Sequence, residues 1–437
     1  MNVGIIGGGW AGLAAAVALH DAGCQVNVHE AAEQPGGRAR GVSRPGFPVT
    51  IDNGQHILLG AYTETLKLMV RLGQDPGKRF LRMPLKLKSA DGQFELRCRN
   101  LPSPLHAAAG VLLAKGWPMC EKVSLTLAML RLKRNGWKVV PDQTVTQWLQ
   151  ANQQSSKVIR QFWEPLCLAA LNTPIEEASA DMLARVLGDS LDAGKQSSDA
   201  LIPTTDLSDL WAAHLPSGIK IHHGSVIRRI TPSAQGYCLD DQAKYDALVI
   251  ATSSASAQRL LATLPALTEA LPLLNDLQAF SPVPIATLTL ALEKPWFELP
   301  EPMMMMNDSN NPGALGQWLF NHAHIAAKPD RQKILSVVIS DCRALMQMDR
   351  DNAMSGLIQQ LQNQTRRFGV MPTLIAKSLI IEKRATFAAT PGLHRPANAT
   401  PWPGLLLAGD WTDTGYPAVL EGAVRSGFSA AQALLKQ

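Results

Sequence analysis

The first thirty residues combine short apolar runs with a glycine-rich break. Val3–Ile6 is apolar without polar alternation, which predicts a strand buried on both faces of a sheet. An alanine-rich segment follows and predicts a helix that ends at the Asp21–Gly23 turn. Gln25–His29 predicts a second strand, and this order favours a parallel sheet covered by helices.

Three glycines separate the first strand from the helix. Gly7, Gly9 and Gly12 have the spacing GxGxxG, with Ala11 in the same turn. The first glycine permits a tight turn, the second lets the backbone approach a pyrophosphate, and the third allows close packing of the helix. Glu30, 18 residues after Gly12, can accept hydrogen bonds from ribose hydroxyls, and an acid there disfavours NADP. A structural glycine turn is the alternative, but the register of all these parts favours dinucleotide binding.

The segment after Glu30 carries a second glycine pair. Gly36-Gly37-Arg38 resembles the second signature of FAD enzymes of the amine oxidase and phytoene desaturase superfamily. Gly37 lets the loop approach the cofactor, and Arg38 supplies fixed positive charge near phosphate. A solvated basic turn is the alternative interpretation. Because NAD-only enzymes have no evident need for this element, the sequence predicts FAD as the cofactor.

Two later segments resemble the places where this superfamily returns to its FAD domain. A strand near Val226 is expected beside the adenine, and another strand leads into a turn of small residues at Ala251. Taken alone, these two strands are generic. The stretch LLLAGDWTDTGYPAVLEGAV is more specific, because it places Gly409 and Asp410 after an apolar strand and before a helix that begins near Val419. Asp410 is expected to contact a ribityl hydroxyl and the pyrophosphate, and the helix N-terminus is expected to point at the flavin ring.

These motifs predict an α/β fold with a Rossmann-like FAD-binding domain of the GR2 type and an interleaved α+β substrate-binding domain. The FAD-binding domain is expected to comprise residues 1–60, 215–260 and 395–437. The substrate-binding domain is expected to comprise residues 61–214 and 261–394. A length of 437 residues, which is long for one core, also favours two domains.

Composition and charge exclude several classes of protein. The net charge is only +5 and the basic residues are scattered, so nucleic acid is not an expected partner. Six cysteines without a CxxC pair indicate neither a disulfide framework nor a zinc site, and no metal is predicted. The sequence shows neither a secretory signal nor an apolar run long enough to span a bilayer, so a cytoplasmic location is expected.

Residues 61–215 lack cofactor motifs and are expected to be largely helical. LHAAAGVLLAKGWPM and EKVSLTLAMLRLKR are apolar stretches flanked by lysine and arginine, as in helices that lie at a membrane interface. Peripheral contact with the inner face of the cytoplasmic membrane and burial in a large domain both remain open. The run Met303–Met306 suits either a lipid-lined pocket or an ordinary strand core.

Further stretches carry a resemblance to a narrower family. IDNGQHILLG, LNTP and SDALIPTTDLS resemble the squalene-associated FAD-dependent desaturases, the hydroxysqualene dehydroxylases of bacterial hopanoid synthesis, over essentially the whole chain. The resemblance implies reductive removal of an allylic hydroxyl from a thirty-carbon isoprenoid alcohol. An acid would protonate the hydroxyl, water would leave, and reduced FAD would deliver hydride to the allylic cation. An external electron donor, which the sequence does not identify, would reduce the flavin.

The acid that protonates the hydroxyl is left open by the sequence. The candidates are His56, Asp189 and Asp206, with Glu164 behind them. Asp206 is equally well interpreted as a helix N-cap before LSDLWAAHL, and Asp189 as a solvated turn residue.

The loop that contains His56 is predicted to cross from the FAD domain to the substrate cavity. Asn53, Gly54, Gln55 and His56 are expected to contact the flavin, and the aliphatic residues after them to begin the substrate wall. Two rival functions share these motifs: a desaturase with the opposite direction of hydride flow, and a non-catalytic isoprenoid carrier. The intact Arg38 and Asp410 elements disfavour the carrier.

Overall fold

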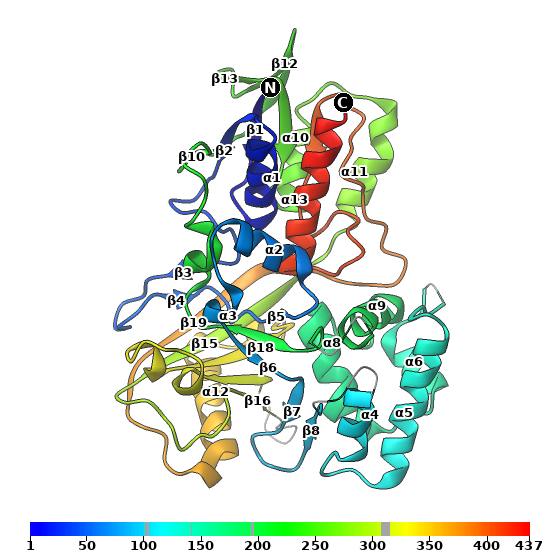
Figure 1. Cartoon of the computed structure of the whole chain (residues 1–437), viewed down its shortest axis with the longest axis vertical. Coiled ribbons are helices and arrows are strands. Elements are labelled where there is room, and N and C mark those ends of the chain that lie inside the picture. The colour runs from blue at the N-terminus through cyan, green and yellow to red at the C-terminus, as the bar shows by residue number, and fades with distance from the viewer. Residues whose placement is uncertain (100, 102–104, 141, 193, 195, 307–314) are drawn as a thin grey trace.

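The computed structural model describes residues 1–99, 101, 105–140, 142–192, 194, 196–306 and 315–437. Figure 1 shows an upper part that holds both termini and a lower part with a β-sheet on one side and helices on the other. Segments from distant parts of the sequence build each of these parts, so the site between them is assembled only in the folded chain.

A parallel sheet forms the centre of the upper part. Its strands, in spatial order, are β10 (Lys220–His222), β2 (Gln25–His29), β1 (Asn2–Ile6), β14 (Ala247–Ile250) and β20 (Leu405–Leu407). All neighbouring pairs are parallel. The whole of β14 and β20 is buried, as expected for strands covered on both faces. The predicted α/β class is therefore confirmed.

Two helices with small residues cover one face of this sheet (Figure 1). They are α1 (Trp10–Asp21) and α13 (Leu420–Leu435), whose ribbons lie side by side. A Cβ atom at Gly427 would lie 2.2 Å from the carbonyl oxygen of Ala11, so only glycine permits this spacing. The neighbouring elements are α10 (Ser254–Leu261), α11 (Leu271–Gln278) and the antiparallel strands β11 (Ile230–Ser233), β12 (Gly236–Leu239) and β13 (Ala243–Tyr245).

An antiparallel sheet forms one side of the lower part. Its strands, in spatial order, are β16 (Met303–Met305), β17 (Trp318–Asn321), β18 (Ile334–Ser340), β15 (Pro282–Leu292) and β19 (Leu374–Phe387). Helix α12 (Arg350–Thr365) packs one face through Leu357 and Leu361. The methionine run alternates as a strand should, because Met304 and Met306 join this core whereas Met303 lines a cavity on the other side.

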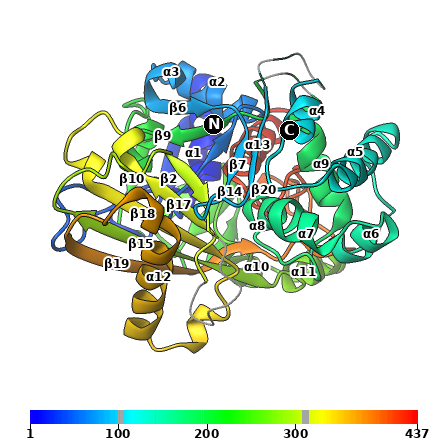
Figure 2. The same ribbon diagram turned by 90° about the horizontal axis from the view of Figure 1, so that it is seen from below.

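Helices form the other side of the lower part, as Figure 2 shows from below. They are α4 (Leu105–Leu112), α5 (Met119–Arg134), α6 (Val145–Ala151), α7 (Ser156–Val158), α8 (Glu164–Leu171) and α9 (Ala180–Leu191). Two more helices, α2 (Thr63–Arg71) and α3 (Pro76–Arg79), lead away from the parallel sheet. Short strands that the sequence did not predict connect these parts: β3 (Gly41–Val42), β4 (Ile51–Asp52), β5 (Leu58–Leu59), β6 (Phe80–Met83), β7 (Lys86–Lys88), β8 (Glu95–Arg97) and β9 (Ala200–Pro203).

The helices of the lower part are too short for a membrane span. Among the described residues, no helix combines the length and apolar character needed to cross a bilayer. The strands of the parallel sheet all come from residues 1–60, 215–260 and 395–437. The domain boundaries themselves stay a prediction.

Candidate active site and cofactor cavity

A continuous cavity of about 1290 Å³, here called the main cavity, extends from the carboxyl ends of the parallel strands into the helical part. It exceeds the roughly 300–1,000 Å³ of a pocket for one drug-sized ligand, so a cofactor and a long substrate can share it. All the predicted cofactor residues except Gly12 line it: Gly7, Gly9, Ala11, Glu30, Gly37, Arg38, Asn53, Gly54, Gln55, His56, Val226, Ala251, Gly409, Asp410 and Val419.

The glycine turn after β1 has the geometry that the spacing predicts. Gly7 has φ +110°, and a Cβ atom there would lie 2.5 Å from the carbonyl oxygen of Ala251. Gly12 lies behind the cavity, where a Cβ atom would lie 2.0 Å from the carbonyl oxygen of Gly7. Its role is therefore the close packing of α1, whereas Gly9 faces the opening and bridges to Gly36.

Glu30 stands at the end of β2 with its carboxylate fixed by backbone donors. Its Oε2 accepts a hydrogen bond of 2.7 Å from the N–H of Gly8, and its Oε1 accepts one of 2.8 Å from Ala32. These bonds hold the acid against the glycine turn at the wall of the cavity.

Arg38 and Asp410 form an ion pair across the cavity wall. Arg38 Nη2 lies 2.8 Å from Asp410 Oδ1, and Arg38 Nη1 donates to the carbonyl oxygen of Ala385 at 2.6 Å. The Asp410 side chain is 8% exposed whereas that of Arg38 is 42% exposed toward the cavity. The charge of Asp410 raises the pKa of Arg38, so the guanidinium stays cationic. The pair joins the two loops that carry the separate FAD motifs.

Arg395 holds the second of these loops and was missed by the sequence analysis. Its guanidinium, 8% exposed, donates to the carbonyl oxygens of Asp410, Thr412 and Tyr416. Burial lowers the pKa of Arg395 to about 10, so it remains charged at neutral pH. A lone arginine outside any motif gave no signal of this role.

Two helix N-termini without side-chain caps face the cavity. Gly9 precedes α1 and Val419 precedes α13, and no side-chain hydrogen bond caps either helix at these positions. Both residues line the main cavity, so unpaired N–H groups and the positive end of each helix dipole are available to anionic groups.

The strand expected near Val226 is β10, which ends before Val226 itself. β10 ends at His222, and Gly224, with φ +64°, turns the chain. Val226 therefore lies in an irregular segment, 53% exposed, but it still lines the cavity. The segment is held by Ser225, whose hydroxyl is 2.8 Å from His29 Nδ1.

The loop at Asn53–His56 lines the main cavity, as do Ile57 and Leu59 after it. His56 Nδ1 lies 2.6 Å from the carbonyl oxygen of Gly54. Because a carbonyl only accepts, Nδ1 carries the hydrogen and Nε2 is unprotonated in the neutral ring. Burial lowers the pKa of His56 to about 4, so the ring is neutral at neutral pH. These properties argue against His56 as the proton donor and leave its contact with the flavin as the better interpretation.

The structure separates the candidate acids. Asp189 lies within α9, not in a turn, and it lines the main cavity, as does Tyr416. Asp206 is not a lining residue of the main cavity. Its Oδ1 accepts hydrogen bonds from the N–H groups of Ser208 and Asp209 and thereby caps a helical turn. Glu164 begins α8, where burial raises its pKa, and it is not a lining residue of the main cavity.

The far half of the main cavity, here called the apolar chamber, is enclosed by aliphatic and aromatic side chains. The sequence analysis did not single out most of them: Leu85, Leu87, Val111, Met129, Phe162, Leu166, Leu183, Leu187, Met303 and Phe320. Among the described residues, no group of three histidine, cysteine or acidic side chains could hold a metal ion. The site is thus polar and glycine-rich at one end and apolar at the other.

The polar end fits FAD. The glycine turn admits a pyrophosphate, Glu30 lies where a ribose would be bound, and Arg38 with two uncapped helix N-termini supplies positive potential. The second loop, from Gly409 onward, continues this polar surface toward the apolar chamber.

Comparisons with known proteins agree with this geometry. Residues 10–435 match the family model described as flavin containing amine oxidoreductase. The chain is 29% identical to hydroxysqualene dehydroxylase of Rhodopseudomonas palustris, covering 99% of this chain and 98% of that protein. It is 23% identical to 15-cis-phytoene desaturase of Synechococcus elongatus, covering 100% of this chain and 96% of that protein. Among solved structures, cyclohexylamine oxidase of Brevibacterium oxydans superposes on this chain with a TM-score of 0.69 at 20% identity. The superposition covers 100% of this chain and 98% of that one, so the two proteins share a fold. The chain therefore belongs to the flavin-containing amine oxidoreductase family and is an FAD-dependent oxidoreductase.

Proposed function

We propose that the protein removes the allylic hydroxyl of hydroxysqualene by reduction and releases squalene. The observation that carries this proposal is the apolar chamber, which continues directly from the polar cofactor end of a cavity of about 1290 Å³. Val419, an aliphatic residue at the flavin end, suits a hydrocarbon better than an amine. The similarity to the hydroxysqualene dehydroxylase of Rhodopseudomonas palustris supports the same substrate.

The chemistry divides between cofactor and protein. Bound reduced FAD supplies the hydride, and an external two-electron donor must reduce it again. The protein holds the isoprenoid in the apolar chamber, excludes water and supplies a proton to the hydroxyl. The C–O bond then breaks with release of water, and the allylic carbon accepts the hydride. One alcohol and one reduced flavin yield one hydrocarbon, one water and one oxidised flavin.

Asp189 is the proposed proton donor. It lines the main cavity together with Tyr416. Burial and the interaction with Asp189 raise the pKa of Tyr416, so the phenol stays protonated. Asp189→Asn is expected to lower kcat by at least about 100-fold, within the range for loss of general acid catalysis, with FAD still bound. Asp181→Asn is the matched control on the same helix, because the Asp181 carboxylate is bonded to Val139 and Arg185.

Anaerobic incubation with hydroxysqualene and chemically reduced FAD tests the reaction. The expected product is squalene, formed with stoichiometric oxidation of the flavin and with one solvent-derived deuterium in D₂O. In a parallel anaerobic incubation with oxidised FAD, reduction of the flavin with formation of a more unsaturated isoprenoid would instead establish the desaturase, which the similarity to 15-cis-phytoene desaturase supports. Purified protein that binds FAD and hydroxysqualene without converting either would establish a carrier.

We further propose that α4 and α5 rest on the surface of an anionic membrane. Their outer faces expose Leu105, Leu112, Leu113, Met119, Val123 and Leu127, each at least 49% exposed. Lysine and arginine flank these side chains at Lys115, Lys122, Arg131 and Arg134. The inner faces of the same helices line the apolar chamber through Val111 and Met129, so a substrate could enter from the lipid.

Vesicle co-sedimentation tests this contact. Wild-type protein is expected to bind phosphatidylglycerol vesicles better than phosphatidylcholine vesicles, and Leu112→Glu with Leu127→Glu is expected to weaken binding at least about tenfold. Leu271→Glu is the control, since Leu271 is 55% exposed on α11 in the upper part. Equal loss in the control, or no binding by the wild type, would refute the membrane contact.

A further inference from the structure

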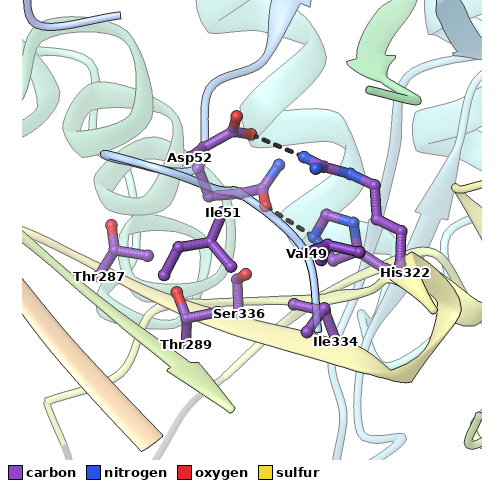
Figure 3. A pocket seen from close by; sticks show the side chains of 10 residues that line it. Val49, Ile51, Asp52, Thr287, Thr289, His322, Ile334 and Ser336 are labelled. Carbon is purple, nitrogen blue, oxygen red and sulfur yellow. Dashed lines mark hydrogen bonds and ion pairs between the residues drawn. The ribbon is translucent and has the colours of Figure 1, made fainter. Parts of the chain in front are cut away.

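A buried group of polar side chains lies behind the loop at Asn53–His56, on the side of the antiparallel sheet. Figure 3 shows these side chains around a small cavity of about 10 Å³, room for about one water molecule. Asp52 and Gln55 come from the FAD-side loop, whereas His322 and Arg331 come from the segment between β17 and β18. These four residues are here called the polar cluster.

An ion pair anchors the start of the loop. Asp52 Oδ2 lies 3.6 Å from Arg331 Nη2, and the two side chains are only 5% and 8% exposed. Arg331 Nη1 also donates to the carbonyl oxygen of Thr50 at 2.8 Å, and Asp52 Oδ1 accepts from the N–H of Leu207 at 3.0 Å. The arginine therefore fastens both ends of β4 from a position about 280 residues later in the sequence.

His322 holds the other end of the loop. Its Nε2 lies 2.9 Å from Gln55 Oε1. A dashed line at His322 in Figure 3 marks this hydrogen bond. The ring is 3% exposed, and burial, with a further contribution from the charge of Arg331, lowers the pKa of His322 to about 3. The imidazole is therefore neutral, and it donates from Nε2 because an amide oxygen only accepts.

This hydrogen bond leaves an acceptor facing a cation. With the hydrogen on Nε2, His322 Nδ1 carries a lone pair. This nitrogen has no hydrogen-bond partner among the described residues. Arg331 Nε, a donor, also has none there, and both residues line the small cavity. The bond to Gln55 thus assigns the tautomer of His322, and burial together with the charge of Arg331 keeps the ring neutral.

We propose that His322 and Arg331 are positioning residues for the cofactor loop. Gln55 lines both the small cavity and the main cavity, and Asn53, Gly54 and His56 line the main cavity with it. The polar cluster fixes this wall before the cofactor arrives, so the loop need not be ordered when FAD binds. The inference rests on FAD occupying the polar end of the main cavity, but not on the identity of the isoprenoid.

The test compares variants on the two sides of the hydrogen bond. His322→Leu and Gln55→Met both remove it, and each is expected to weaken FAD binding about tenfold and to change the visible spectrum of the bound flavin. The double variant is expected to bind FAD no more weakly than either single variant, because both remove the same interaction. His322→Gln retains a hydrogen-bond donor. It is expected to recover at least half of the FAD-binding free energy that His322→Leu loses.

Thr289→Val is the control for a general disturbance, since Thr289 lines the same small cavity from β15. FAD titration of apoprotein and absorbance spectroscopy need no substrate, so their outcome is independent of the proposed dehydroxylation. Wild-type affinity and spectrum in Gln55→Met, or additive losses in the double variant, would overturn the positioning role. Equal loss in Thr289→Val would also overturn it. If His322→Leu does not fold, Gln55→Met and His322→Gln still decide the matter.

Discussion

Replacement of Arg38 by methionine tests the link between the two FAD loops. The variant keeps the length of the side chain but removes its bonds to Asp410 Oδ1 and to the carbonyl oxygen of Ala385. A hydrogen bond that involves a charged group contributes about 1.5–3 kcal/mol. Because the Arg38 side chain is 42% exposed, solvent screening favours the lower part of this range. We take about 2 kcal/mol, which corresponds to about 30-fold weaker binding of FAD.

Titration of apoprotein with FAD, followed by quenching of flavin fluorescence, measures this change. Arg44→Met is the matched control, because Arg44 is an exposed residue of the next loop, between β3 and β4, and is not a lining residue of the main cavity. Asp410→Asn is expected to weaken binding to a similar extent, and the double variant should lose less than the sum of the two. FAD affinity within threefold of the wild type in Arg38→Met would refute the argument that this pair organises the cofactor end.

Two further predictions concern stability and pH. Glu421 is fully buried and accepts hydrogen bonds from the N–H groups of Glu64 and Thr65 at the start of α2, so Glu421→Gln is expected to cost about 3 kcal/mol of unfolding free energy in urea denaturation. An unchanged denaturation midpoint would contradict this role. Burial lowers the pKa of His56 to about 4 in the folded chain, whereas its pKa in the unfolded chain is about 6.5. Between these two pH values, only the unfolded chain binds a proton at His56. The unfolding free energy should fall over that window, and less steeply in His56→Ala, whose bound flavin should also show an altered visible spectrum. Burial raises the pKa of Asp52 to about 6, so protonation of Asp52 below that pH stabilises the folded chain and opposes the effect of His56. The contribution of His56 is therefore measured as the difference in pH dependence between His56→Ala and the wild type.

The sequence predicted those parts of the site that depend on local geometry. The turn at Gly7 requires a positive φ, which a short motif can reveal, and the strand before Gly409 is continuous and apolar. The strand expected near Val226 is β10, and the turn at Gly224 leaves Val226 itself in an irregular segment, which the sequence did not reveal. Arg395 and Arg331 could not be predicted, since each acts on partners that only the tertiary fold brings near. The capping role of Asp206 was one of two open interpretations, and burial and hydrogen bonds were needed to choose between them.

The loop DNGQHILLG joins the two halves of the enzyme both along the chain and through contacts. Asn53–His56 line the cofactor end, whereas Ile57 and Leu59 continue the wall of the main cavity. The polar cluster ties the same loop to the segment before β18, and Thr287 of β15 lines both the small cavity and the main cavity. A substrate that contacts Thr287 would therefore lie next to the residues that hold Gln55. Substrate binding and flavin properties should consequently depend on each other, with the antiparallel sheet as the element that both share. Reciprocity then requires that FAD and the isoprenoid change each other's affinity by the same factor, and Gln55→Met is expected to reduce that factor.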